Sequence, residues 1–251
     1  MIFNKFFILF KIGRKIGKSN IINIISETHK IPIFIKIFFN LLSFSFSSSK
    51  DTKSHSKDHL SASIQEMGTT FIKLGQFLAT RPDIIGEKLS KKLESLQDKL
   101  PPFSKKEAEK IIIENLGQSN FDNIIDFSDP IAAASIAQVH KAKIKEDNII
   151  KNVAIKVLRP NIKKIFNEEI DAIMLLAYII ESLITKTKRL KLIEVTFLFK
   201  EITNHEMDLR FEAAAANEYA ENTKNDLGFI VPKIYWNFTS ESVLTLDWID
   251  G

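Results

Sequence analysis

Large hydrophobic side chains recur at helical spacing in the middle of the chain. Between residues 60 and 78 they stand three or four residues apart, which predicts a helix with one buried stripe. The sequence RPD at residues 81–83 should end this helix, and Asp83 can cap a second helix over residues 84–96. The buried stripe consists of Leu60, Ile64, Met67, Phe71, Leu74 and Leu78.

The next helix has clear signals at both ends. Pro101 and Pro102 break the chain. Ser104 followed by Glu107 is typical of a capping box, and Gly117 is a typical residue to end the helix.

Strand-like alternation begins after residue 130. Two alternating runs, residues 135–144 and 153–158, are joined by a polar turn and predict a β-hairpin. A helix from Pro160 to about Leu183 and another over residues 193–220 should follow. The closing sequences "VPKIYWNF" and "SVLTLDWID" predict a second hairpin. This order of elements indicates an α+β fold with an antiparallel sheet and an added helical N-terminal region.

The N-terminal segment differs in charge from the remainder. Residues 1–50 contain eight Lys or Arg and one acid, a net charge of +7; because the whole chain carries +4, residues 51–251 carry −3. Two helices are expected at residues 3–17 and 20–46, and the Ser-rich residues 45–59 form a linker. A basic segment rich in Phe and Ile suits a membrane surface, although a core helical hairpin with solvated lysines fits the same pattern.

Several site types are disfavoured. The chain has no cysteine, which excludes disulfides, thiolate metal sites and cysteine nucleophiles. The apolar run at residues 31–46 is interrupted by Lys36 and Asn40, so a spanning helix is not expected. His55 and His59 have the spacing of a helical zinc site but lie in a Ser/Lys linker, which favours solvated histidines. Basic residues alternate with large aliphatic ones, which argues against nucleic-acid binding.

Lys156 is the first candidate for chemistry. It interrupts the apolar strand "VAIKVLRP" and is either an edge-strand solubiliser or a cation directed into a cleft. In the helix predicted over residues 193–220, Glu206 falls in an apolar stripe, where a carboxylate is costly without a cation. A helix packed on the sheet could bring Lys156 to a carboxylate, with Glu206 favoured and Glu201, Asp208 and Glu212 open as partners; solvated ends for both groups fit the same pattern.

Small residues precede the lysine strand. Ala132, Ala133, Ala134 and Ser135 stand where a nucleotide-binding hairpin carries glycines. Backbone N–H groups in such a turn can bind phosphate, but alanine restricts φ and limits close approach. Tight packing is the simpler interpretation of this pattern taken alone.

Five motifs in order resemble the UbiB/ADCK family of atypical protein-kinase-like proteins, which is linked to ubiquinone biosynthesis. They are "FIKLGQFLATRPDII", "PIAAASIAQVHKA", "VAIKVLRP", "EMDLRFEAAAANEYAEN" and "LTLDWIDG". The first carries the KxGQ motif as Lys73, Gly75 and Gln76, and the fourth carries the ExD motif as Glu206 and Asp208. The resemblance spans roughly residues 60–251.

The resemblance implies a protein-kinase-like N-lobe, a small antiparallel sheet with helices, behind an α-helical extension. It implies that Lys156 binds the phosphates of ATP or ADP and pairs with a carboxylate, Glu206 first and Glu212 second. Residues 132–135 would cover the phosphates. Lys73 and Gln76 would reach from the extension into the active-site cleft. Together with Glu206 and Asp208 they would be the catalytic residues.

These implications divide the chain and locate it. The expected parts are residues 1–59, a basic amphipathic segment with its linker; 60–118, the helical extension with the KxGQ motif; and 119–251, the N-lobe. The implied partners are the membrane surface and a ubiquinone-precursor lipid or biosynthetic enzymes. The implied location is the cytoplasmic face of a bacterial inner membrane or an equivalent reducing site.

The catalytic-loop and DFG residues of kinases follow the hinge, and the sequence ends at Gly251. We therefore expect residues 1–251 to be part of a longer protein and to be inactive in phosphoryl transfer by themselves. No metal site is expected here, and Mg²⁺ is expected only with the missing C-lobe. The alternative function is a non-catalytic scaffold or lipid-binding protein of the ubiquinone biosynthetic complex.

Overall fold

The computed structural model describes residues 58–94, 96, 100–226 and 228–250, together with residues 8, 10, 13 and 14. The predictions for residues 3–17 and 20–46, the linker before residue 58, the zinc alternative at His55 and His59 and the membrane-contact segment fall outside the described side chains. The chain divides into two compact units. The helical unit comprises residues 1–98 and 164–200, and the sheet unit comprises residues 99–163 and 201–251.

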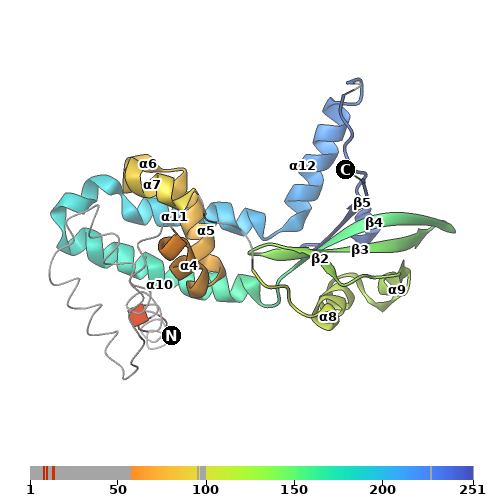
Figure 1. Cartoon of the computed structure of the whole chain (residues 1–251), viewed down its shortest axis with the longest axis horizontal. Helices are drawn as coiled ribbons and strands as arrows, with labels where there is room; N and C mark the ends of the chain where they lie inside the picture. The colour runs from red at the N-terminus through yellow and green to blue at the C-terminus, as the bar shows by residue number, and fades with distance from the viewer. Residues whose placement is uncertain are drawn as a thin grey trace. The chain divides into compact units, whose positions relative to one another are not determined.

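In its first part, the described residues of the helical unit form α4 (Asp58–Met67), α5 (Thr69–Ala79), α6 (Pro82–Ile85) and α7 (Glu87–Leu93) (Figure 1). The predicted apolar stripe is present, but the single helix expected for it is divided at Gly68, where φ is +101°. The second expected helix is divided at Gly86, where φ is +80°. At these two positions the positive φ interrupts the helix, which periodicity alone does not reveal.

The second part of the helical unit comes from a helical hairpin. It consists of α10 (Ile162–Leu183), the 3₁₀ turn η1 (Thr185–Leu190) and α11 (Leu192–Glu206), whose outer ends continue into the sheet unit. Phe199 of α11 contacts Phe166 of α10 and Phe77 of α5, with ring centroids 5.6 and 5.5 Å apart. Phe166 and Phe199 are almost fully buried, so this aromatic cluster forms part of the core of the unit.

An antiparallel sheet organises the sheet unit (Figure 1). Its strands are β1 (Ile124–Ile125), β2 (Pro130–Ala133), β3 (Ala137–Glu146), β4 (Ile149–Leu158) and β5 (Val243–Asp247). The order is β1-β3-β4-β5, and β2 pairs with β3 beside β1. The predicted hairpin is therefore present as β3–β4, and its turn places Asp147 and Asn148 at positive φ.

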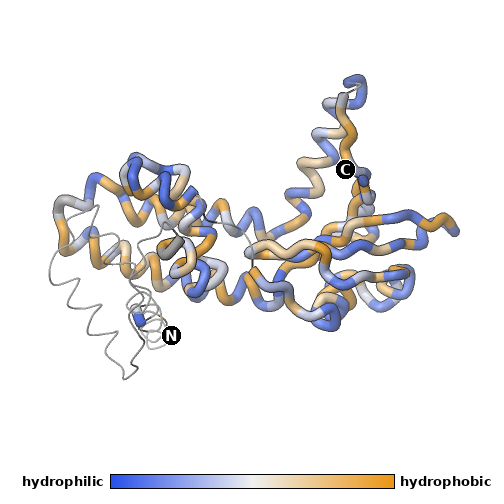
Figure 2. The backbone as a smooth tube through the Cα atoms, viewed as in Figure 1, coloured by the Kyte–Doolittle hydropathy of each residue, from blue (hydrophilic) through white to orange (hydrophobic). Residues whose placement is uncertain are grey.

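The two faces of the sheet differ. On one face, Val153, Ile155 and Val157 of β4 are fully buried and pack with α8 (Lys105–Leu116) and with Tyr235 and Phe238. The capping box predicted at Ser104 and Glu107 is confirmed, as is the end of α8 at Gly117; the short helix α9 (Gln118–Phe121) follows. The other face carries Lys156. Along the chain, Figure 2 shows hydrophilic stretches in both strands of the hairpin toward its turn.

The structure corrects two sequence predictions in the C-terminal part. The helix expected over residues 193–220 is two helices, α11 and α12 (Leu209–Asn222), because Asp208 leaves helical geometry and caps α12. The second hairpin forms only in part: Ile234 makes one antiparallel bridge to Leu246, flanked by backbone bonds from Tyr235 to Thr245 and from Asp247 to Lys233, and the 3₁₀ turn η2 (Trp236–Phe238) follows in place of a longer strand. The strand β5 also pairs with β4.

The α+β prediction is confirmed, with an antiparallel sheet and helices throughout the described part of the chain. The proposed divisions at residues 59/60 and 118/119 stay predictions. Within the described ranges, no helix combines the length and the apolar character needed to cross a bilayer.

Candidate nucleotide-binding site

Lys156 and Glu212 form an ion pair at the centre of the sheet unit. Lys156 lies near the end of β4, and its Nζ donates to both carboxylate oxygens of Glu212 on α12, at 2.9 and 2.7 Å. The side chain of Lys156 is 26% exposed and that of Glu212 is 49% exposed. The lysine stem is therefore largely covered, while the charged ends meet near solvent.

The carboxylate that meets Lys156 is Glu212, the second candidate, and not Glu206, which the sequence pattern favours. That preference depended on an unbroken helix, in which residue 206 shares a stripe with Ile202 and Leu209. The break at Asp208 removes this periodicity: Leu209 is fully buried, whereas Ile202 and Glu206 are exposed. Glu206 is the last residue of α11 and is exposed, so its carboxylate does not need a buried cation as partner.

The alanine-rich turn is aligned with Lys156 by strand register. Ala132 of β2 is opposite Val139 of β3, which is opposite Lys156 of β4, which is opposite Leu244 of β5. Directly opposed residues in antiparallel strands present their side chains on the same face. The sheet therefore places one row of residues, from the alanine turn to Lys156, on a single face.

The turn itself is closed by its own hydrogen bonds. The N–H of Ala134 donates to the carbonyl of Ala137 at 2.8 Å. The guanidinium of Arg159 donates twice to the carbonyl of Ala134, at 3.1 and 2.8 Å. Ser135 is fully buried, whereas Ala132 is exposed. In this conformation Ala132 faces solvent, Ala133 and Ala134 are partly buried, and Ser135 belongs to the interior.

Beside the buried Leu244, three partly exposed apolar side chains that we did not select from the sequence share the face of Lys156. Val139 is in its row, and Ala154 and Leu246 are opposed to each other in the next row of this face. All three are partly buried, which leaves apolar surface beside the ammonium group. The strict alternation along β3 and β4 was the available signal, because it assigns each residue to a face once the register is known.

A second group missed from sequence lies on the opposite, packed face. The Gln138 side chain accepts from the N–H of Phe103 at 2.9 Å, donates to its carbonyl at 3.2 Å and contacts His140 Nε2 at 2.9 Å. His140 Nδ1 contacts the carbonyl of Ser128 at 2.9 Å, and its ring stacks on Phe127. Since the amide of Gln138 donates to Nε2, the imidazole is neutral with its proton on Nδ1. Burial lowers the pKa of His140, in agreement with this assignment.

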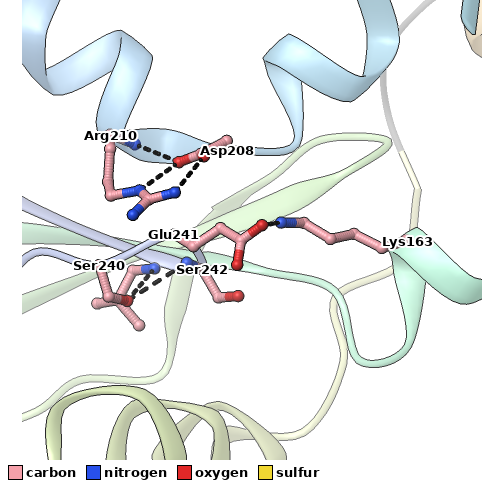
Figure 3. Close-up of polar contacts among 7 residues, drawn as sticks. Lys163, Asp208, Arg210, Ser240, Glu241 and Ser242 are labelled. Atoms are coloured by element: carbon pink, nitrogen blue, oxygen red, sulfur yellow. Dashed lines mark hydrogen bonds and ion pairs between the residues drawn. The ribbon is translucent and has the colours of Figure 1, made fainter.

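The start of α12 is surrounded by charged groups (Figure 3). Asp208 pairs with Arg210, and the Arg210 guanidinium lowers the pKa of that carboxyl. Glu241, which precedes β5, pairs with Lys163 in the first turn of α10. A hollow of about 370 Å³ lies beside these groups. It is lined by Lys163, Asn204, His205, Asp208, Phe211 and Glu241.

Lys73 and Gln76 lie on one helix, α5, in the helical unit. Both are partly buried, and Gly75 between them is buried against Leu96 and Ile64. Their action on the Lys156 site stays a prediction. The described ranges contain no cluster of three or more His, Asp or Glu residues arranged to hold a metal ion.

Comparison with known sequences identifies the family of the chain. The ABC1 atypical kinase-like domain matches residues 95–251, which include the turn, Lys156 and Glu212. The chain belongs to this family. It is 35% identical over 223 residues to the "Probable protein kinase UbiB" of Marinobacter nauticus, covering 88% of this chain and 40% of that protein. The corresponding protein of Pseudomonas paraeruginosa is 30% identical over 244 residues, covering 97% of this chain and 45% of the relative.

The chain thus spans less than half the length of these curated relatives. The expected relation to UbiB proteins is confirmed, and so is the kinase-like N-lobe fold. The residues present suit a nucleotide in two respects: a lysine ammonium held by a carboxylate faces the same side as apolar residues, and a solvent-facing turn lies in its row.

Proposed function

We propose that this chain provides the adenine-nucleotide-binding lobe of an atypical kinase-like protein that supports ubiquinone biosynthesis. The observation that carries the proposal is the ion pair of Lys156 and Glu212 on the sheet face that also bears the alanine turn. ATP or ADP would supply the phosphate groups, and the lysine would bind them.

The chain's own residues account for three tasks in this proposal. Glu212 holds the Lys156 ammonium in a fixed direction along the sheet, since both of its carboxylate oxygens accept from Nζ, at 2.9 and 2.7 Å. Val139, Ala154 and Leu246 offer apolar surface suited to a planar base. The solvent-facing residue of this segment, Ala132, would approach the phosphates with its backbone groups, and Ser135 would support the turn from inside.

The roles outside the lobe are also part of the proposal. Lys73 and Gln76 would act at the same nucleotide from the helical extension, and the basic residues 1–50 would bring the protein to an anionic membrane surface, near a ubiquinone-precursor lipid or its enzymes. ATPase-type activity would also require Mg²⁺ and the catalytic-loop and DFG residues of kinases. The family relation and the charge of the N-terminal segment support these roles.

The test is nucleotide binding by the full-length protein. We expect ADP and ATP to raise its melting temperature and Lys156→Ala to abolish the shift, because the variant loses the only charge that the proposal assigns to the phosphates. Lys143→Ala is the matched control: this β3 lysine pairs with Asp126 at 2.7 Å, so its removal costs an ion pair of similar length elsewhere on the sheet.

If ADP or ATP still raises the melting temperature of the Lys156→Ala variant, the proposal is contradicted. Equal loss in Lys156→Ala and Lys143→Ala also contradicts it, because general damage to the sheet would then explain both. If the wild-type protein binds no nucleotide at all but still supports its partner enzymes, the scaffold alternative replaces the proposal.

A further inference from the structure

Asp208, the residue that caps α12, is held by several hydrogen bonds. Asp208 Oδ1 accepts from the backbone N–H of Arg210 at 3.1 Å and from its Nε at 2.9 Å, and Oδ2 accepts from Nη2 at 2.7 Å. The Asp208 side chain is only 13% exposed, while that of Arg210 is 61% exposed. Both carboxylate oxygens are therefore engaged within the first turn of α12 (Figure 3).

A second attachment joins the same turn to the sheet. The N–H of Leu209 donates to the carbonyl of Glu241 at 3.0 Å, and Leu209 itself is fully buried. The Glu241 side chain reaches Lys163, which lies in the first turn of α10, the helix that follows β4 (Figure 3). The start of α12 is thus tied to the residues preceding β5 and, through Glu241, to the residues following β4.

Glu212 lies four residues after Asp208, one turn further along α12. Its ion pair with Lys156 is 49% exposed on the acid side, and an ion pair this accessible does little to hold a helix in place. The location of Glu212 must then be set by what holds α12, which is the cap at Asp208, the backbone bond to Glu241 and the packing of Leu209 and Ala213.

We propose that Asp208 is a positioning residue: it caps α12 and thereby places Glu212 against Lys156, and it does not contact the nucleotide or its metal. This assignment rests on the proposed function, in which Lys156 binds the phosphates. It separates Asp208 from the catalytic role that the ExD motif implies. Glu241 and Lys163 serve the same purpose from the sheet side.

Two substitutions at position 208 distinguish capping from ligand contact. Alanine removes the cap and the charge, whereas asparagine retains the capping oxygen and loses the charge; Asn and Asp are equivalent caps. In full-length protein titrated with the fluorescent nucleotide mant-ADP, we expect Asp208→Ala to weaken binding up to about five-fold, the factor that corresponds to loss of an average cap. Asp208→Asn should recover most of this loss and bind within about two-fold of wild type.

A double-mutant cycle tests whether Asp208 acts through Glu212. In a Glu212→Gln background, Asp208→Ala should weaken mant-ADP binding no further, because placing residue 212 no longer matters once its charge is absent. Glu221→Ala is the control on the same helix: it removes an exposed carboxylate paired with Lys224 near the end of α12 and should leave binding unchanged.

Equal damage by Asp208→Asn and Asp208→Ala overturns the proposal, because the charge would then matter and not the cap. Independent, multiplying effects of Asp208→Ala and Glu212→Gln overturn it as well. Failure of the proposed function looks different: Lys156→Ala would then bind mant-ADP as well as wild type, whatever the variants at position 208 do.

Discussion

The buried His140 makes the stability of the sheet unit depend on pH in a calculable way. Gln138 donates to its Nε2, and both the N–H and the carbonyl of Phe103 fix the orientation of that amide. A protonated imidazole would place a second donor at this contact. Turning the amide to accept it would instead lose both bonds to Phe103. Protonation of His140 is therefore opposed by burial and by the direction of the hydrogen bonds.

The sign follows from the lowered pKa. Burial is the main cause of the lowering; Lys105 adds to it, and the Ser128 carbonyl, Asp129 and Glu109 act against it. The unfolded chain binds more protons than the folded protein below pH 6.5, the usual pKa of His, so stability is fully present above that value. It is lost as pH falls from 6.5 toward the folded pKa, at up to about 1.4 kcal/mol per pH unit.

The perturbation is His140→Asn. At pH 7.5 we expect this variant to be about 1–3 kcal/mol less stable than wild type, because the Gln138 amide loses its buried acceptor. Asparagine does not titrate, so the difference between wild type and variant should narrow by about 1 kcal/mol as pH falls from 6.5 to 5.5.

Urea denaturation followed by tryptophan fluorescence suits this test. The chain has two tryptophans, Trp236 and Trp248, and both lie in the sheet unit. Measurements above pH 5 limit the titration of carboxylates, and His205→Asn, at an exposed histidine of the same unit, is the matched control. A wild-type-to-variant difference that stays constant from pH 7.5 to 5.5 would refute the reasoning.

Two further predictions concern one helix of each unit, α5 in the helical unit and α8 in the sheet unit. Gly75→Ala should stabilise the helical unit by up to about 1 kcal/mol, since the new Cβ would lie 3.5 Å from Leu96 and 3.7 Å from Ile64 in ordinary contact and alanine favours the helix; a fall in the thermal midpoint measured by circular dichroism would contradict this. Ser104→Ala should cost about 1 kcal/mol in urea denaturation, because the Ser104 hydroxyl caps the N–H of Glu107, whereas Ser104→Asp should retain most of the stability; equal losses would show that the cap is not the cause.

Local signals carried the prediction furthest where one short stretch contains all the partners. The capping box of Ser104 and Glu107 spans four residues, and the alternation of β3 and β4 spans one hairpin. The motif order was enough to recognise the UbiB relationship and to select Lys156, the alanine turn and Glu212 as site residues. None of these inferences required knowledge of how distant elements pack.

Predictions failed where periodicity was extended through a residue that changes the backbone direction. Gly68 and Gly86 adopt positive φ, and Asp208 leaves the helix to cap the next one. Each of these residue types is tolerated inside a helix at modest cost, so the sequence pattern continues across the break. The choice of Glu206 over Glu212 was one consequence of this.

The sequence by itself determined which residue types are present for the proposed nucleotide site, their order, and the α+β character of the chain. Only the tertiary structure decided which carboxylate meets Lys156 and which residues share its face. The reason is that a face or a contact depends on strand register and on the placement of α12, and both are set by groups far apart in sequence, such as Leu209 with Glu241 and Gln138 with Phe103. Such non-local bonds have no signature in the local pattern of hydrophobic and polar residues.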